Sequence, residues 1–443
     1  MARPLCFVLM PFGSKPDSTG ALIDFDAVYR QLINPAIQES GLEPIRADEE
    51  MTGGVIHKAM YERLILCEYA VADLTTANAN VFYELGVRHA LRPYTTVQIY
   101  AERGRLPFDV SPLRTIPYRL TVDGAPAEVE RARAMLIERL RAARVDAPDS
   151  PLFQLIDGLR PASIDREKTD VFREQVYYSA QMKDRLAEGR RRGVATLQKI
   201  QEDMEPIQDA EAGIVIDLFL SYRAVRAWEL MIALVEKMSP PLARSVMVRE
   251  QLALALNRFG KGEQAEHVLL DLLKERGPSS ETYGILGRVY KDRWEAASKE
   301  GNAFLAGGIL NQAIDAYVKG FESDWRDAYP GVNAVTLMEL KDKPDSRRER
   351  LLPVVTYAVQ RRIESGRPDY WDYATMLELA VLARDKEQAE SAISSALAVL
   401  REVWEAETTA RNLRLIREAR ERRGETIDWA KEIERALEKG AAS

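Results

Sequence analysis

Short apolar runs alternate with helical patterns along the first third of the chain. Residues 5–10 and 69–72 are apolar on both faces, which is typical of strands buried in a parallel sheet. Between these runs, apolar positions at residues 25–40 have helical spacing and are followed by Gly41, a residue type that commonly ends helices. Pro35 lies inside this predicted helix and is expected to kink it.

The following segments continue the alternation up to residue 143. Strands are predicted at residues 42–47, 95–100 and 116–122, and helices at residues 56–68, 81–91 and 127–143. Residues 14–24, rich in Gly, Ser, Pro and Asp, are predicted to form a loop over the carboxyl end of the first strand. Because strand and helix alternate regularly, we expect a flavodoxin-like α/β domain with a parallel sheet at residues 1–147.

Helical periodicity alone continues after residue 148. Pro148, Pro151 and Pro161 mark the joint, and a helical connector is predicted at residues 148–190. A spaced pattern of large and small residues then begins at Arg249, recurs 34 residues later at Tyr283, and returns in register at Tyr373. This period is typical of the tetratricopeptide repeat. We therefore predict an all-α tetratricopeptide-like superhelix at residues 191–443, with an irregular helical bundle as the alternative.

The second of these repeats, which contains Leu286-Gly287-x-x-Tyr290, is the most specific copy. Ala313 and Tyr317 complete it if the loop between its two helices, around residues 298–308, is longer than usual.

Composition narrows the classes of function. The chain has 443 residues, 46% of them hydrophobic and 30% charged, with a net charge of −7, so we expect a soluble protein without a general attraction for nucleic acid. No apolar run approaches the roughly 18 residues that span a membrane, and no signal-peptide pattern opens the sequence. Two cysteines, Cys6 and Cys67, favour a reducing cytoplasm, and three scattered histidines make a structural zinc site an unfavoured hypothesis.

Candidate chemistry concentrates between residues 72 and 86. A buried strand ends in Asp73, a polar loop follows, and a helix begins near Asn80 with Glu84 about one turn inside it. Open α/β sheets bind ligands at the carboxyl ends of their strands. Asp73 and Glu84 are therefore predicted to face one crevice, with Asn80 beside them.

The amino-terminal part of the chain contains several short motifs. They are Met10-Pro11-Phe12-Gly13, Asp73, Asn80-Val81-Phe82-Tyr83-Glu84-Leu85-Gly86, Phe108-Asp109 and Arg114-x-x-x-Tyr118. Together they resemble the nucleoside 2-deoxyribosyltransferase-like superfamily, and more narrowly its predicted deoxyribohydrolase branch, which is related to Toll/interleukin-receptor-type domains. The resemblance covers roughly residues 4–145, and its Asn-x-x-x-Glu-Leu-Gly part is the most specific.

The resemblance implies catalytic roles for two carboxylates. Glu84 falls where the superfamily glutamate attacks an anomeric carbon or stabilises its cationic character. Asp73 is expected to hold ribose hydroxyls or to act as a general acid or base, and burial beside Glu84 to raise one of the two pKa values. The transferases carry an aspartate in the loop where Asn78 and Asn80 stand here, which favours hydrolysis of a nucleotide or dinucleotide, with NAD as one candidate, over transfer between bases.

Substrate-binding roles follow from the same resemblance. Asn80 would orient the sugar or the catalytic glutamate, Phe12 and Tyr83 would stack on a base, and Arg114 would pair with a phosphate. Pro11 and Gly13 would let backbone N–H groups approach the ligand. No cofactor and no metal are expected.

Each of these residues also has a structural explanation. Glu84 would pair with Arg88 one helical turn away, Asp73 would cap its loop through an Asx-turn, and Asn80 would cap the helix. Phe12 and Tyr83 would belong to the core, and Asp109 and Arg114 would form an ion pair.

The helical part carries a second resemblance. Residues 317–338, including Tyr329-Pro330-Gly331-Val332-Asn333-Ala334, are similar to the helical repeat region of apoptosis signal-regulating kinases and their bacterial relatives; no kinase signature is present. The leading hypothesis is a cytosolic stress or immune signalling protein whose α/β domain hydrolyses an N-glycosidic bond while the repeats sense a protein or small-molecule ligand. A non-catalytic nucleotide- or protein-binding scaffold and a homo-oligomeric effector are the alternatives.

Overall fold

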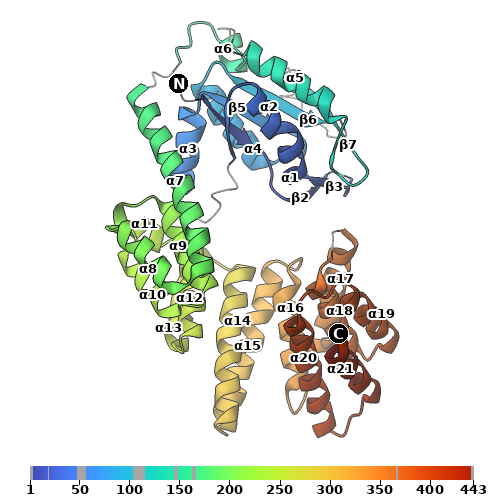
Figure 1. Cartoon of the computed structure of the whole chain (residues 1–443). Helices are drawn as coiled ribbons and strands as arrows, with labels where there is room; N and C mark the ends of the chain where they lie inside the picture. Colours follow the sequence, from blue (N-terminus) through green and yellow to red (C-terminus); the bar gives the residue numbers. More distant parts are fainter. Residues whose placement is uncertain are drawn as a thin grey trace. The chain divides into compact units, whose positions relative to one another are not determined.

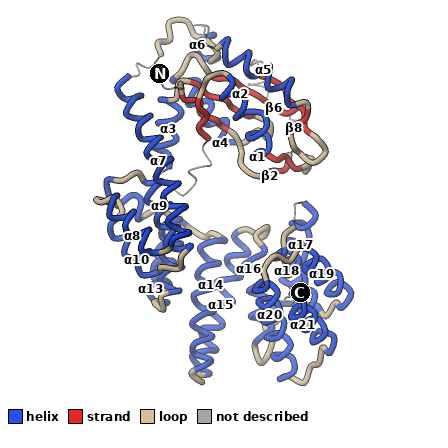
Figure 2. Tube along the Cα trace, viewed as in Figure 1, coloured by secondary structure: helices blue, strands red, loops and turns tan. Residues whose placement is uncertain are grey.

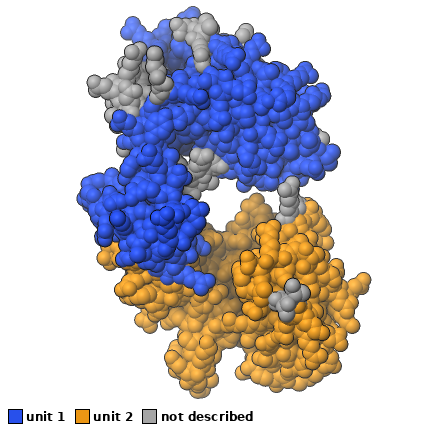
Figure 3. Space-filling model, in the orientation of Figure 1, with its two compact units in different colours: residues 1–227, 237–245 blue, residues 228–236, 246–443 orange. Residues whose placement is uncertain are grey.

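A computed structural model describes residues 3–17, 19–46, 56–102, 115–143, 148–161, 166–365 and 368–440. The chain forms two compact units (Figure 3). Unit 1 comprises Met1–Ala227 with Lys237–Ser245, and unit 2 comprises Trp228–Glu236 with Val246–Ser443. The sheet and the connector helix both lie in unit 1, and the domain limits predicted at residues 147 and 190 stay predictions.

Unit 1 contains a six-stranded sheet in the order β4-β1-β5-β6-β7-β8, and all the strands of the described residues lie in this unit (Figure 2). The first five pair in parallel and β8 is antiparallel to β7. The strands are β1 (Leu5–Leu9), β4 (Glu43–Arg46), β5 (Tyr69–Asp73), β6 (Thr96–Ala101), β7 (Thr115–Leu120) and β8 (Pro126–Ala127). The parallel α/β fold predicted from the alternation is confirmed.

Helices cover both faces of this sheet (Figure 1). Because successive strand side chains alternate, Cys6 and Val8 pack on one face while Leu5, Phe7 and Leu9 pack on the other. The first face is covered by α1 (Phe25–Val28), η1 (Tyr29–Ile33), α2 (Asn34–Glu39) and α5 (Val129–Ala142). The second is covered by α3 (Ile56–Leu66) and α4 (Ala79–Leu91). Both faces of β1 are therefore sealed from water.

One local prediction in this unit is wrong, and another is refined. Residues 14–24 contain an antiparallel hairpin of β2 (Ser14–Pro16) and β3 (Leu22–Asp24) rather than a plain loop, because its strands are too short to show a period of two. The helix predicted at residues 25–40 is interrupted by the π-helical turn η1 just before Pro35. Proline has no N–H to donate, which fits the changed hydrogen-bond spacing just before it, and the kink at Pro35 stays a prediction.

The connector helix α7 (Arg166–Arg192) packs on the α3–α4 side of the sheet. Phe172 joins the core there, and Arg173 forms an ion pair with Glu68 at 2.6 Å. The remaining helices of unit 1 are α6 (Pro151–Leu155), α8 (Val194–Asp203), η3 (Ile207–Asp209), α9 (Ala212–Ala224) and α11 (Pro240–Ala243).

Unit 2 is an all-helical repeat. Its helices are α10 (Trp228–Lys237), α12 (Val246–Arg258), α13 (Gly262–Arg276), α14 (Ser280–Lys299), α15 (Ala303–Ser323), α16 (Ala328–Leu340), α17 (Arg347–Ser365), α18 (Tyr370–Ala383), α19 (Lys386–Ala398), α20 (Val403–Arg422) and α21 (Asp428–Gly440). The pairs α12–α13, α14–α15 and α18–α19 coincide with the three sequence repeats, and the predicted tetratricopeptide-like architecture is confirmed.

The second repeat differs from its prediction in one respect. Only residues 300–302 separate α14 from α15, so the extra residues lengthen the two helices instead of the loop. Gly287 and Tyr317 meet where these helices cross, and a Cβ added at Gly287 would lie 2.6 Å from the Tyr317 ring. A small residue is therefore a steric requirement of this crossing.

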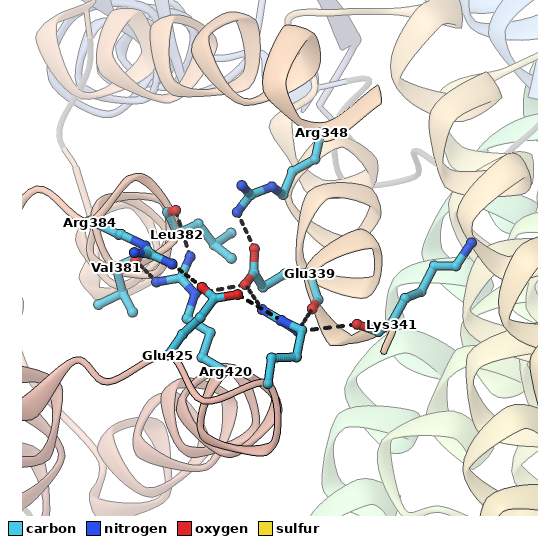
Figure 4. A network of polar contacts seen from close by, with 9 residues as sticks. Glu339, Lys341, Arg348, Val381, Leu382, Arg384, Arg420 and Glu425 are labelled. Atoms are coloured by element: carbon cyan, nitrogen blue, oxygen red, sulfur yellow. Dashed lines mark hydrogen bonds and ion pairs between the residues drawn. The ribbon is translucent and has the colours of Figure 1, made fainter. Parts of the chain in front are cut away.

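A buried ion cluster connects α16, α18 and α20 (Figure 4). Glu339 of α16 and Arg420 of α20 are each 1% exposed, and Arg420 Nε donates to Glu339 Oε1 at 2.7 Å. The two terminal nitrogens of Arg420 donate to the carbonyls of Val381 and Leu382 at the end of α18. Arg348 also pairs with Glu339. Such a cluster is costly to break, because removing one partner leaves the other charge buried and unpaired.

Within the described residues, no helix combines the length and apolar character that a membrane span would need.

The α14–α15 crossing gives a stability prediction. Gly287→Ala should destabilise unit 2 by about 1–3 kcal/mol, because the added methyl group collides with the Tyr317 ring. Gly307→Ala is the matched control on α15, where an added Cβ meets nothing within 4 Å, and it should be neutral or stabilise by up to about 1 kcal/mol through helix propensity. All six tryptophans lie in unit 2, so urea unfolding followed by tryptophan fluorescence measures this unit. Equal midpoints for the two variants would contradict the packing argument.

Candidate functional site

The candidate site lies at the carboxyl edge of the sheet, where β1 and β5 are neighbours. Leu9 pairs with Ala72, so the segment after β1 and the segment after β5 leave the sheet side by side. The chain then turns to opposite faces, since the helices that follow β1 pack on one face and α4 packs on the other. Loops that diverge in this way form the crevice in which doubly wound sheets bind ligands.

Asp73 ends β5 and is 1% exposed. Its Oδ1 accepts hydrogen bonds from the Thr75 backbone N–H at 3.0 Å and from Thr75 Oγ1 at 2.5 Å, and its Oδ2 accepts one from Tyr118 Oη at 2.8 Å. Burial raises the pKa of this carboxyl, while the hydrogen bonds from Thr75 and Tyr118 oppose the rise. The bond from the Thr75 N–H is the Asx-turn expected for a structural aspartate, and the catalytic role of Asp73 stays a prediction.

Glu84 is half-buried on α4, beside the row of Val81, Leu85 and Arg88 that faces the sheet. The structure records no hydrogen bond or ion pair for its carboxyl within the described residues. Burial raises its pKa from 4.5 to about 7. The pKa of Asp73 is raised as well, and in both cases the cause is burial rather than the charge of the other carboxylate.

Arg88 does not pair with Glu84, so that structural explanation is wrong. Its side chain is fully buried and donates to the backbone carbonyls of Leu64 in the last turn of α3 and of Cys67 and Glu68 just beyond it. A guanidinium with five donors satisfies carbonyl groups that the helix itself leaves without partners. The Arg88 guanidinium therefore does not form an ion pair with the Glu84 carboxylate.

Asn78, not Asn80, is the N-cap of α4. Its Oδ1 accepts from the N–H groups of Asn80 and Val81, and α4 begins one residue earlier than Asn80. Asn80 is exposed and its side chain is not used in the cap, which leaves it available for the ligand contact that was predicted. Two asparagines in one loop gave no sequence signal for choosing between them.

The Pro11-Phe12-Gly13 segment that follows β1 is contacted by two residues that the sequence did not single out, Asp26 and Arg46. Asp26 accepts a hydrogen bond from the Gly13 N–H at 3.2 Å and forms an ion pair with Arg46, the last residue of β4. Arg46 places its guanidinium over the Phe12 ring at 5.5 Å. The contact with Arg46 lowers the pKa of Asp26. The position of Arg46 at the carboxyl end of a predicted parallel strand was the signal that could have pointed to it.

The remaining predicted contact residues differ in burial where the structure describes them. Pro11 is buried, Phe12 and Gly13 are half-buried, and Gly13 has a φ of +62°, which favours glycine. Tyr83 is 58% exposed and its hydroxyl lies 2.8 Å from that of Tyr61, so the core explanation for Tyr83 is wrong. Arg114, with Phe108 and Asp109, lies outside the described residues.

Both cysteines are fully buried, as expected for Cys67 as a small apolar residue. Within the described residues no cluster of three metal-ligating side chains occurs.

Comparison with known proteins places most of the chain in one family. Residues 81–435 match the model of the MAP3K TRAFs-binding domain. The chain belongs to this family. The match begins inside α4, three residues before Glu84, and continues into α21.

Curated relatives of this family member are MAP kinase kinase kinases. Mitogen-activated protein kinase kinase kinase 15 of Mus musculus is 29% identical over 235 residues, which are 50% of this chain and 17% of the relative. The kinase nsy-1 of Caenorhabditis elegans is 30% identical over 222 residues, which are 45% of this chain and 14% of the relative. The chain therefore spans about one sixth of the length of these kinases. The predicted similarity of the helical part to such kinases is confirmed.

Two solved tetratricopeptide proteins are among the partial structural matches. One from Thermus thermophilus has a TM-score of 0.35 at 14% identity and covers 46% of this chain and 99% of its own. Another from Parabacteroides merdae has a TM-score of 0.34 at 13% identity and covers 61% of this chain and 98% of its own.

The pKa of Glu84 predicts how the stability of unit 1 depends on pH. The native state holds the proton more tightly than the unfolded state, so this group lowers the stability of the fold as pH rises from about 4.5 to about 7. Glu84→Gln should therefore leave stability unchanged near pH 4 and raise it above pH 8 by on the order of 2 kcal/mol. Pulse proteolysis in urea, with unit 1 fragments followed by mass spectrometry, measures this difference.

The control is Glu138→Gln, which removes an exposed carboxylate on α5 of the same unit and should change stability little at either pH. A Glu84→Gln effect that is equal at both pH values would contradict a burial-raised pKa.

Proposed function

We propose that this chain is a cytosolic signalling protein whose α/β part binds a nucleotide-type ligand and hydrolyses its N-glycosidic bond. The observation that carries the proposal is the state of Glu84, a half-buried carboxyl without a polar partner in the described residues and with a pKa near 7. It stands on the helix that follows the switch-point strand. A carboxylate in that place suits attack on an anomeric carbon or stabilisation of an oxocarbenium ion.

In this proposal the other edge residues divide into positioning and binding groups. Both carboxyl oxygens of Asp73 accept hydrogen bonds, from Thr75 and Tyr118. Asp73 therefore acts by positioning the loop that leads to Asn78 and α4. Asn80, Phe12 and Tyr83 contact the sugar and base, Pro11 and Gly13 let the backbone approach the ligand, and Arg114 pairs with a phosphate. NAD is the first dinucleotide to test, because hydrolysis at its nicotinamide ribose needs no acceptor other than water.

Family membership supports the signalling part of the proposal. The matched family is described as binding TRAFs, and its curated members here are signalling kinases. We assign the helical repeat the role of binding a protein partner or ligand and of controlling the α/β site. Kinase activity is not proposed for this chain, since the sequence carries no kinase signature.

A second candidate is a non-catalytic nucleotide- or protein-binding scaffold. The hydrogen bonds of Asp73 favour this scaffold, because both of its carboxyl oxygens already accept from Thr75 or Tyr118. A hydrolysis that needs two free carboxylates would then lack the second one.

An activity assay with matched variants separates the two candidates. The full chain is incubated with NAD, AMP and deoxynucleotides, and free base is measured by chromatography. We expect base release that falls at least about a hundredfold in Glu84→Gln and is retained in Glu138→Gln. Release unchanged by Glu84→Gln would contradict the role of Glu84. A thermal shift with these ligands but no free base would support the scaffold instead.

A further inference from the structure

A cavity of about 830 Å³ opens within unit 2. Its walls come mainly from every second helix of the repeat, namely α12, α14, α16, α18 and α20, with two residues from α17. Alternate helices line the concave side of a stacked repeat, so the cavity follows from the architecture. Its volume falls within the range of small-molecule binding sites.

The charges that line this cavity are unbalanced. Three carboxylates are already paired with lining arginines: Asp292 with Arg288, Asp372 with Arg362, and Glu295 with Arg411. Three further cations, Arg258, Lys291 and Lys299, line the wall without a hydrogen bond or ion pair recorded within the described residues.

The fourth lining carboxylate, Glu378, forms no direct ion pair with the three remaining cations within the described residues. It is 8% exposed and accepts hydrogen bonds from Thr336 Oγ1 at 2.5 Å and Asn412 Nδ2 at 3.4 Å. Burial raises its pKa, which favours the uncharged carboxyl. Burial also lowers the pKa of Lys291, whose ammonium is attracted from a distance by Glu378, Glu295 and Asp292, is repelled by Arg288, and forms no direct ion pair within the described residues. An anionic ligand group beside Lys291 would supply the compensation that this wall lacks.

Aromatic rings and neutral polar groups complete the lining. Trp294, Trp371 and Tyr329 present ring surface, and Trp371 and Tyr329 are 36% and 51% exposed. Thr375 and Asn412 add hydroxyl and amide groups that can donate to or accept from a ligand. Ring surface next to cations suits a molecule that combines a planar heterocycle with a phosphate.

We propose that this cavity binds a small phosphorylated nucleotide, with its phosphate at Lys291 and Lys299 and its base against the tryptophan rings. The inference rests on the proposed ligand-sensing role of the helical repeat and names the class of that ligand. It is separate from the α/β site, because every residue of the cavity belongs to unit 2.

Tryptophan fluorescence tests the proposal without interference from the α/β site. All six tryptophans lie in unit 2, and excitation at the red edge of the indole band avoids absorption by adenine. AMP added to the full chain should quench the fluorescence saturably and bind more tightly than adenosine or inorganic phosphate. Trp371→Phe or Trp294→Phe should remove much of the quench while circular dichroism remains unchanged.

Charge variants identify the binding wall. Lys291→Met should weaken AMP binding about tenfold or more, since it removes a charge-assisted contact, and Lys299→Met should weaken it by a smaller factor. Lys319→Met is the matched control, because this lysine is exposed on α15 of the same unit and does not line the cavity; it should change binding by less than about twofold. Glu84→Gln should leave the quench unchanged even if it abolishes base release.

Three outcomes would overturn the inference. They are the absence of a saturable response to AMP, an AMP response insensitive to Lys291→Met and Lys299→Met, and binding of an oligoglutamate peptide in place of AMP. The last result would indicate an acidic protein segment as the occupant. Absence of base release by the unsubstituted chain, with AMP quenching intact, would count against the α/β proposal alone.

Discussion

The reversal of winding direction between β1 and β5 is the constraint on which the first unit depends. These strands are neighbours in the sheet, yet the helices that follow them pack on opposite faces. Their loops therefore separate at the carboxyl edge, where backbone and polar side chains meet. Arg46 ends β4, Asp73 ends β5 and the Pro11–Gly13 segment follows β1, so polar groups from neighbouring strands gather at this edge.

Burial of charge then separates structural residues from candidate functional ones in both units. Asp73 is satisfied by Thr75 and Tyr118, and Glu339 by Arg420 and its neighbours, so these groups stabilise the fold. Glu84 and Lys291 are buried enough to have shifted pKa values and have no such partners within the described residues. Groups of this kind are the ones that a ligand can compensate.

Most of the architecture could be predicted from the alternation of strands and helices and from the 34-residue period of the helical repeats. Both-face apolar runs identified the central strands, and the small residue at Gly287 identified a helix crossing that the structure explains by the Tyr317 ring. Partners distant in sequence were not predictable. Tyr118 reaches Asp73 across 45 residues, and Arg88 serves carbonyl groups beyond the end of another helix. Helical spacing made a pairing of Glu84 with Arg88 one alternative, but Arg88 instead donates to backbone carbonyls distant in sequence.

The central claim is that Glu84 is a desolvated carboxyl at a nucleotide-type site. Carbon NMR of the chain labelled at its glutamate carboxyl carbons tests it directly, with the Glu84 signal assigned by its loss in Glu84→Gln. The account predicts a titration midpoint of about 7 and a shift of that signal when NAD or another nucleotide is added. A midpoint near the ordinary glutamate value of about 4.3, with no response to any nucleotide, would contradict it.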